Sequence, residues 1–411
     1  MFEKDKWKTK FMLVALGQAI SLLGSHGVQF ALIWWLAEQT SSPLMLGLSG
    51  LVAYLPMTVF SPLAGIAADR FSRKLICILS DMAMGVIALA YAICLLLFDL
   101  PVWTVLIMLC VRGIGSTFQQ PAIESIIPQL VPKNQLVKTN GWMQLLNAGS
   151  FLLGPVIGST LYAAFPMSVV LMSDVIGAAL ASIALAVVKI PKLEKSQEAK
   201  QNMLADFKEG LQVFQRDRKL FYLIIAEALC MFFYAPLSSF YPLMTSDYFN
   251  LSAIFGSVVE LSFAVGMMVS SLLFSSVLKV NRKIRVSYLG LLAMGVVSAA
   301  CGMLPPSFGG WIVFALLCAG LGASGNVHTI PLTAYLQQTV EAEKMGRAFS
   351  VLTLICSVTM PVGLLASSPI AEKVGVPVWF YIAGIAIFMI TIVIWLRYRL
   401  IGRKGETTYD S

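Results

Sequence analysis

Charged residues are scarce in this chain, and the residue patterns of most enzymes are missing from it. Asp, Glu, Lys and Arg make up 12% of the 411 residues, about half the share found in an ordinary soluble domain. No G-x-x-x-x-G-K-[ST] phosphate loop, no G-x-S-x-G elbow and no G-x-G-x-x-G fingerprint opening a helix occurs. With two histidines in the chain, His-based catalysis has little to work with. We therefore predict no enzyme, no catalytic residue and no cofactor.

Cysteine is used sparingly and without a metal-binding pattern. The seven cysteines are scattered within apolar runs, with no C-x-x-C pair and no histidine spacing suited to zinc. Isolated cysteines of this kind are typical of small buried hydrophobic residues. The sequence therefore predicts no metal site.

Long apolar runs account for most of the chain. Apolar residues make up 58% of it, and so few charges cannot provide the polar coat of a water-soluble core. We therefore predict an all-α membrane protein with twelve transmembrane helices in two six-helix bundles. Runs of membrane-spanning length fall at residues 11–37, 44–68, 75–97, 102–125, 140–164, 168–189, 219–246, 252–278, 284–304, 310–337, 347–370 and 377–398.

The positive charges are distributed unevenly between the two sides of the membrane. If the N-terminus lies inside, all 29 Lys and Arg residues except Arg112 and Lys373 fall in cytoplasmic segments. We therefore place both termini in the cytoplasm. The net charge of +8 does not indicate nucleic acid, because the cations are interleaved with apolar spans and form no single patch. The first apolar run is too long for a signal peptide, so we interpret it as a retained span in contact with the lipid bilayer.

The longest polar connection lies in the middle of the chain. We predict an N-terminal six-helix bundle at residues 1–189, a cytoplasmic linker at 190–218, a C-terminal six-helix bundle at 219–400 and a cytoplasmic tail at 401–411. Apolar residues recur at helical spacing from Leu204 to Phe214, which favours an amphipathic helix on the cytoplasmic leaflet. A flexible charged linker is the alternative.

A charged hinge of ten residues separates the second and third runs. It has the pattern G-x-x-x-D-R-x-x-R-K, formed by Gly65, Asp69, Arg70, Arg73 and Lys74. An acid followed by three cations cannot lie in hydrocarbon and marks a tight turn at a water-facing surface.

This pattern resembles the loop between helices two and three of the major facilitator superfamily, with Ser72 where the family usually has a second Gly. The resemblance implies a gating loop whose Asp lies near the start of helix eleven, here at residues 347–350. A carboxylate at a helix N-terminus contributes about 0.3–1 kcal/mol, which biases a two-state opening without freezing it. A basic turn that sets only the topology is the alternative.

A second motif lies in the fifth run, at Gly141, Ser150, Gly154, Pro155 and Gly158. It resembles the G-x8-G-x3-G-P-x-x-G-G motif of superfamily antiporters, with Ser at two Gly positions. Physically, it predicts a bendable helix with one smooth face that packs closely on a neighbour. The resemblance implies export, and a packing role alone is the alternative.

Ionisable residues inside the spans form the third feature. Each costs at least about 2.5 kcal/mol on insertion scales, so each indicates a function by default. In the superfamily, helices one, four, seven and ten line the central cavity, and here these helices carry His26, Arg112, Glu227 and His328. Arg112 matches an Arg that the superfamily often places in helix four and that is implicated in proton coupling.

A solitary Arg near the midplane needs a carboxylate partner. Glu227 is the first candidate from its place on a cavity-lining helix, and Asp81, Asp174 and Glu260 are the alternatives. A role for Arg112 in pinning helices together is the other interpretation.

Sparse polar groups among apolar and aromatic residues predict a cavity for a bulky amphipathic ligand. The candidate cavity residues are Gln18, Ser25, His26, Gln29, Ser116, Gln119, Phe233, Tyr234, Asn326 and His328.

Several runs resemble the bacterial macrolide-efflux branch of the superfamily, which contains drug:proton antiporters. They lie at residues 7–11, 17–21, 101–103, 130–136, 189–192 and 247–249. Arg112, Asp81, Asp174 and Glu260 lie in stretches that match this branch, whereas Glu227 and His26 do not carry over from it. This raises the three aspartate and glutamate alternatives over Glu227 as partners of Arg112.

The resemblance implies the major facilitator fold in a bacterial cytoplasmic membrane, and export of amphipathic antibiotics, above all macrolides. The energy source would be the proton gradient, without a cofactor. Another amphiphile as cargo (a lysophospholipid, siderophore or peptide) and a non-transporting receptor or scaffold are the alternatives. The sequence leaves open whether the protein is a monomer and whether an ABC-type partner assists it.

Overall fold

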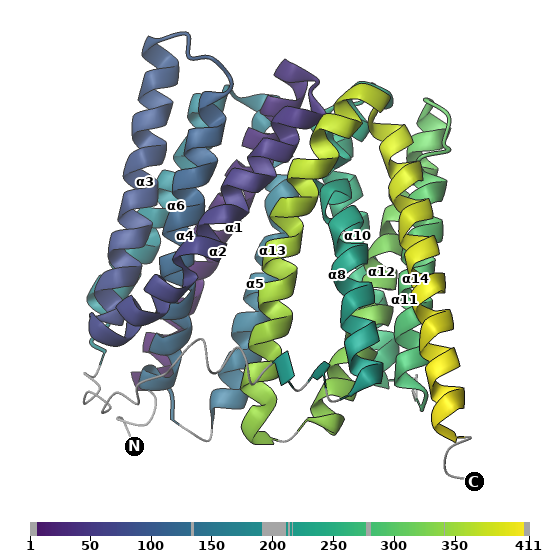
Figure 1. Ribbon diagram of the computed structural model, residues 1–411. Coiled ribbons are helices and arrows are strands. Elements are labelled where there is room, and N and C mark those ends of the chain that lie inside the picture. Colours follow the sequence, from purple (N-terminus) through teal and green to yellow (C-terminus); the bar gives the residue numbers. More distant parts are fainter. Residues whose placement is uncertain are drawn as a thin grey trace. The chain divides into compact units, whose positions relative to one another are not determined.

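Helices make up all the regular structure that the computed structural model describes (Figure 1). It describes residues 6–132, 135–190, 211–212, 214–215, 217–276, 281–340 and 342–406. Most of the predicted linker at 190–218 and the end of the predicted tail lie outside these residues, so the predicted amphipathic helix is not tested.

The helices follow the predicted apolar runs closely. From the N-terminus they are α1 (Lys6–Thr40), α2 (Pro43–Arg70), α3 (Arg73–Leu97), α4 (Thr104–Leu130), α5 (Leu136–Ala164) and α6 (Met167–Val187). These are followed by α8 (Arg218–Ser239), α9 (Tyr241–Leu243), the π-helix η2 (Met244–Tyr248), α10 (Ala253–Ser276), α11 (Lys283–Cys301), α12 (Phe308–Thr339), α13 (Ala342–Val374) and α14 (Val376–Glu406).

Among the described residues, ten helices are long and apolar enough to cross a membrane. The prediction of an all-α membrane protein is therefore confirmed. The predicted number of twelve spans and the cytoplasmic position of both termini stay predictions.

The chain divides into two compact units. Unit 1 comprises residues 1–196 together with 251–261, and unit 2 comprises residues 197–250 and 262–411. The start of α10 thus belongs to unit 1 and the rest of that helix to unit 2.

Each unit has its own packing. In unit 1, α1 packs against α5 and α6, α2 against α4, and α3 against α4 and α6. In unit 2, α11 packs against α12 and α14, and α8 against α13 and α14. Buried apolar side chains fill each unit, for example Phe11, Ile126 and Leu185 in unit 1.

Short polar side chains start the helices at the tight turns. Ser42 precedes Pro43, and its Oγ accepts a hydrogen bond of 3.3 Å from the Met45 amide. Ser72 does the same for α3, accepting from the Leu75 amide at 3.4 Å. Serine at an N-cap satisfies an amide that the helix leaves unpaired. This gives a physical reason for Ser72 at a position where the family usually has Gly.

The seventh predicted run, at 219–246, is not a single α-helix. α8 ends at Ser239 and is followed by α9 and η2. Pro236 and Pro242 lie at this point, and proline lacks the amide hydrogen that a continuous helix needs. The run therefore consists of one long α-helix followed by two short elements near its end.

Candidate functional site

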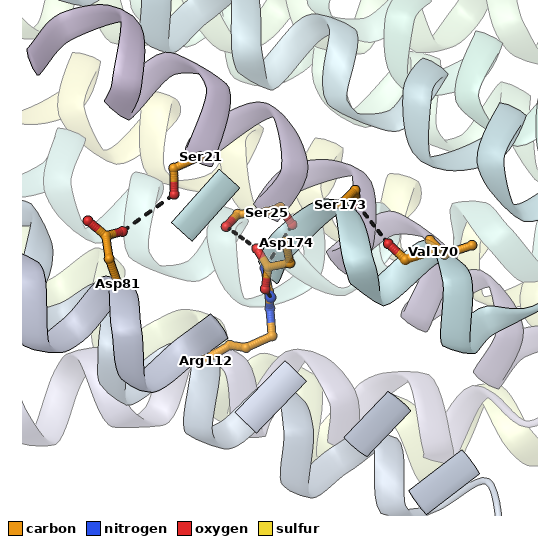
Figure 2. Close-up of polar contacts among 7 residues, drawn as sticks. All are labelled: Ser21, Ser25, Asp81, Arg112, Val170, Ser173 and Asp174. Atoms are coloured by element: carbon orange, nitrogen blue, oxygen red, sulfur yellow. Dashed lines mark hydrogen bonds and ion pairs between the residues drawn. The ribbon is translucent and has the colours of Figure 1, made fainter. Parts of the chain in front are cut away.

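A buried ion pair lies inside unit 1. Arg112 on α4 reaches Asp174 on α6, where its Nη1 contacts Oδ2 of the carboxylate (Figure 2). Its Nη2 donates to the main-chain carbonyl of Ser25 on α1 at 2.9 Å. The Ser25 hydroxyl in turn donates to Oδ1 of Asp174 at 2.7 Å. Three helices are thus joined through one guanidinium and one carboxylate.

This ion pair identifies the carboxylate partner of Arg112. Asp174, one of the three alternatives, is its partner, and the first candidate, Glu227, is wrong. Glu227 belongs to unit 2 and faces a histidine there. The side chains of Arg112 and Asp174 are 9% and 3% exposed. Because both charges are buried, each neutralises the other, which would be costly alone in the apolar interior.

A second buried carboxylate, Asp81 on α3, has a different environment. Gln119 on α4 donates to its Oδ1 at 2.5 Å and Gln18 on α1 to its Oδ2 at 3.2 Å. Ser21 on α1 donates to Oδ1 at 3.4 Å (Figure 2). The amides of Gln18 and Gln119 also bond to each other at 3.3 Å. Asp81 is therefore held by neutral donors, whereas Asp174 is held by a cation.

The donors of Asp81 include two predicted cavity residues. Gln18 and Gln119 are 3% and 8% exposed, and their amides bond within unit 1. Their contact with Asp81 is one that sequence reasoning missed. The available signal was one polar residue within each of three apolar runs, but the sequence does not show which helix faces pack against one another. Their predicted role in lining a cavity stays a prediction.

Close packing of α1 on α5 involves the predicted antiporter motif. A Cβ atom at Gly158 would lie 2.8 Å from the carbonyl carbon and Cα of Gly27, and a Cβ at Gly154 would collide with His26. The Ser150 hydroxyl donates to the Ala19 carbonyl at 3.3 Å. The smooth face of α5 thus allows the backbones of α1 and α5 to touch.

The other motif positions are less informative. Pro155 lies within α5, and the side-chain environment of Gly141 lies outside what the structure describes. The predicted link of this motif to export stays a prediction.

Three predicted cavity residues of unit 1 show varied surroundings. The His26 ring makes an edge contact with Phe151, with centroids 5.8 Å apart. Ser116 is exposed, and its hydroxyl bonds to the Gly113 carbonyl of its own helix at 3.1 Å. Gln29 is half-buried.

In the hinge, Lys74 has a structural contact that the sequence did not suggest. Its Nζ donates to the carbonyls of Ala186 and Val188 at 2.8 and 2.9 Å, where α6 ends. A cation at a helix C-terminus satisfies carbonyls that have no partner within the helix.

The remaining hinge positions stay predictions. The side chains of Gly65, Asp69 and Arg70 lie outside the described part, as do most of those at 347–350. Arg73 is half-buried at the first position of α3. The gating role of the hinge is therefore not tested.

Five predicted site residues lie in unit 2. His328 on α12 lies with its Nε2 3.9 Å from Oε2 of Glu227 on α8. Asn326 donates to the Met267 carbonyl at 2.7 Å and to the Ser271 hydroxyl at 2.9 Å, which ties α12 to α10. The Phe233 ring stacks near Trp379, with centroids 6.3 Å apart. Tyr234 is half-buried.

Glu260 is half-buried on α10, within unit 1, and interacts electrostatically with Tyr54. The structure pairs it with no cation among the described residues. It is therefore not the partner of Arg112.

Sequence reasoning also missed a cluster at the end of α1. The Glu38 carboxylate accepts hydrogen bonds of 2.6 Å from both Trp34 Nε1 and the Tyr162 hydroxyl of α5. The fully buried Trp34 ring packs on Gly256 at the start of α10. These contacts explain why the start of α10 belongs to unit 1. A Glu at the end of an apolar run was the only signal, and it resembles an ordinary interfacial charge.

Among the described residues, no group of three or more His, Cys, Asp or Glu side chains is placed to hold a metal ion. The chemistry that the structure offers is therefore that of buried acids, one guanidinium and two imidazoles.

Comparison with known proteins places the chain in a family. A sequence profile described as "Major Facilitator Superfamily" matches residues 14–364. Macrolide efflux protein A of Streptococcus pyogenes is 36% identical over 394 residues, which are 96% of this chain and 97% of that protein. Macrolide efflux protein A of Enterococcus faecalis is 34% identical and covers 79% of this chain and 99% of its own length.

Solved structures agree on the fold. The nucleoside transporter NupG matches with a TM-score of 0.69 at 14% identity, over 95% of this chain and 99% of that one. A bacterial homologue of the iron transporter ferroportin in an inward-facing state matches with a TM-score of 0.72 at 14% identity, over 94% of this chain and 98% of that one. At these identities the likeness concerns the fold alone. The chain belongs to the Major Facilitator Superfamily, in the branch that contains the macrolide efflux proteins.

Proposed function

We propose that this protein exports amphipathic antibiotics, macrolides above all, in exchange for protons and across a bacterial cytoplasmic membrane. The observation that carries the proposal is the 36% identity to Macrolide efflux protein A over nearly the full length of both chains. The buried charges of unit 1 support the proton-coupled part, because ionisable groups inside membrane helices are costly and are kept where they serve transport. The proton gradient supplies the energy, and no cofactor takes part.

The two acids of unit 1 have different tasks in this proposal. Asp174 remains the partner of Arg112, whose guanidinium offsets the charge of the carboxylate. Asp81 carries the transported proton, because neutral donors and burial leave its negative charge without a compensating cation. Both acids contact α1, through Ser25 and through Gln18 and Ser21.

In this proposal, that arrangement supports alternating access. When Asp81 gains a proton, its hold on the donors of α1 weakens, since a neutral carboxyl accepts hydrogen bonds less strongly than a carboxylate. The free energy of each position of α1 relative to α3 and α4 then depends on whether Asp81 is protonated. Drug binding and proton loss on the cytoplasmic side reverse the change.

Replacing Asp81 with asparagine tests the proton carrier. Asp81→Asn keeps the size of the side chain and an oxygen acceptor for Gln119 or Gln18, so the protein is expected to fold and bind drug. It loses the titrating group, and uphill efflux should fall to the level of empty vesicles. Exchange of labelled for unlabelled macrolide at equal concentrations on both sides, which needs no net proton movement, should persist.

Thr160→Ala serves as the control, because the Thr160 side chain is exposed on α5 and its hydroxyl donates to the Val156 carbonyl of its own helix. Undiminished uphill efflux by Asp81→Asn would show that the proton lies elsewhere. Loss of both uphill efflux and exchange would show that Asp81 serves the fold or the drug site.

The cargo is the least constrained part of the proposal. The Staphyloferrin A transporter of Staphylococcus aureus is 22% identical over 93% of this chain, and the multidrug efflux pump Tap of Mycolicibacterium fortuitum is equally distant. A siderophore or another amphiphile is therefore the second candidate. Resistance profiling in an efflux-deficient host, with and without a protonophore, separates the two. Protonophore-sensitive macrolide resistance supports the first, and a growth effect confined to siderophores supports the second.

A further inference from the structure

A glutamate and a histidine face each other inside unit 2, and the proposed function uses neither. His328 Nε2 lies 3.9 Å from Glu227 Oε2, and the two side chains are 0% and 6% exposed. Glu227 lies about 14 Å along α8 from its start at Arg218, given a rise of about 1.5 Å per residue. The pair is therefore deep in its spans.

The other ring nitrogen of His328 shows how the imidazole is held. Nδ1 lies 3.1 Å from the Ser287 carbonyl oxygen and 2.7 Å from the Ser287 hydroxyl. The carbonyl only accepts, whereas the hydroxyl can donate, so Nδ1 either donates to the carbonyl or accepts from the hydroxyl, according to the tautomer of the ring. Gly290, one turn further along α11, lets the two backbones touch, since a Cβ there would lie 2.9 Å from Cα of His328. The ring is thus fixed against α11.

In one neutral tautomer the hydrogen is on Nδ1 and Nε2 presents a lone pair toward Glu227; in the other, Nε2 carries the hydrogen and Nδ1 accepts from the Ser287 hydroxyl. In both tautomers, a neutral imidazole beside an ionised Glu227 leaves one negative charge on the pair, inside a membrane span where a charge is costly. One proton, on either group, removes that net charge. The geometry therefore has a place for one proton.

We propose that Glu227 and His328 together form a proton-binding site of unit 2, separate from the acids of unit 1. The site is neutral overall when it holds the proton and carries one negative charge when it does not. A charge inside a membrane span is costly, so the occupancy of this site depends on how far water reaches it. Binding of the proton itself does not depend on the cargo; its use in transport rests on the proposed function.

The helices packed around the pair carry further titratable groups. Cys230 follows Glu227 by about one turn of α8, and its Sγ lies 3.5 Å from Thr391 Oγ1 of α14. Tyr288 of α11 is adjacent to Ser287, and its ring packs near Tyr398 of α14, with centroids 5.9 Å apart. From α13, Gly363 packs on the backbone of Phe232. Thiols and phenols are ordinarily neutral at pH 7, so neither Cys230 nor Tyr288 brings a charge to the pair.

The chain offers an unusually clean way to observe the site, because it contains only two histidines. Purified full-length protein with ¹⁵N-labelled histidine is reconstituted in lipid, and its two imidazole signals are assigned by His26→Gln and His328→Gln in turn. The nitrogen shifts distinguish the two neutral tautomers from the imidazolium. Infrared difference spectra between acidic and alkaline samples report the carbonyl stretch of any protonated carboxylic acid.

The expected result is a single coupled titration. Either the His328 signals convert between the imidazolium and a neutral tautomer, or an acid carbonyl band that Glu227→Gln removes appears at low pH. In both cases, replacing one residue of the pair alters the titration of the other. If His328 titrates, Glu227→Gln removes the imidazolium form at the pH where the unsubstituted protein shows it. If Glu227 titrates, His328→Gln shifts the acid band.

The proposal is overturned if neither group changes its protonation over the pH range in which the protein stays folded, or if each titrates unaffected by loss of the other. Titration followed on unsubstituted protein keeps the test valid even where a variant folds poorly. Adding erythromycin then tests the link to transport. A titration that is present but unmoved by the macrolide would count against a part for this site in transport and leave the proton site itself standing.

Discussion

Replacing Arg112 with alanine is expected to abolish uphill macrolide efflux in vesicles. Asp174 would then be a buried carboxylate without its cation, and breaking such a pair costs about 3–5 kcal/mol. The carbonyl of Ser25 would lose its donor as well. The measurement is macrolide uptake into inside-out vesicles driven by a pH gradient, normalised to the amount of folded protein.

A double variant separates a structural role from a coupling role. In Arg112→Ala with Asp174→Asn, the unpaired charge is gone, so the free energy of unfolding should recover most of the loss seen in Arg112→Ala. Uphill efflux should stay absent, because the ion pair that holds α1, α4 and α6 in one arrangement is missing. If the double variant transports normally, Arg112 serves only to neutralise the buried charge of Asp174, and the coupling role is wrong.

The close approach of α1 and α5 leads to the second large effect. Gly158→Ala places a Cβ atom 2.8 Å from backbone carbon atoms of Gly27, and backbone atoms move only if the helices separate. Overpacking of this kind typically costs about 1–3 kcal/mol. We expect a clear drop in thermal stability in detergent and loss of efflux per folded molecule.

Gly149→Ala on the same helix is the matched control. A Cβ atom at Gly149 meets nothing within 4 Å, and alanine favours a helix over glycine by about 1 kcal/mol. Its stability should therefore equal or slightly exceed that of the unsubstituted protein. Equal stability and transport for both variants would mean that α1 and α5 do not pack as the structure has them.

The fold was accessible from the sequence because apolar runs and their length decide what crosses a membrane. The break after α8 could have been foreseen as well, since Pro236 and Pro242 both lie in the seventh run. The residue at which the helix breaks could not have been foreseen, because the backbone near a proline can adopt several conformations of similar local energy.

The polar contacts were harder to predict than the residues that make them. Arg112 is conspicuous as a lone cation in an apolar run, yet its partner Asp174 lies in another helix and only the packing of α4 on α6 brings them together. Glu227 and His328 were each singled out as buried charges, but not as neighbours of each other. A single sequence gives the cost of each charge and not the partner that offsets it.

The role of Ser72 shows the opposite case. In the sequence Ser72 is only a departure from the family pattern, whereas the structure gives it the N-cap of α3. Lys74 likewise belongs to a hinge motif and contacts the last carbonyls of α6. Motif residues thus have local structural contacts that a pattern does not reveal.

Coupled movement of a macrolide and protons is the central claim, and one measurement tests it most directly. The purified protein is reconstituted into liposomes that contain a pH-sensitive dye, and a macrolide gradient is imposed without a pH gradient. We expect protons to move in the direction opposite to the macrolide in liposomes with the unsubstituted protein, and no proton movement in those with Asp81→Asn. Macrolide transport without any accompanying proton movement in the unsubstituted protein would contradict the account.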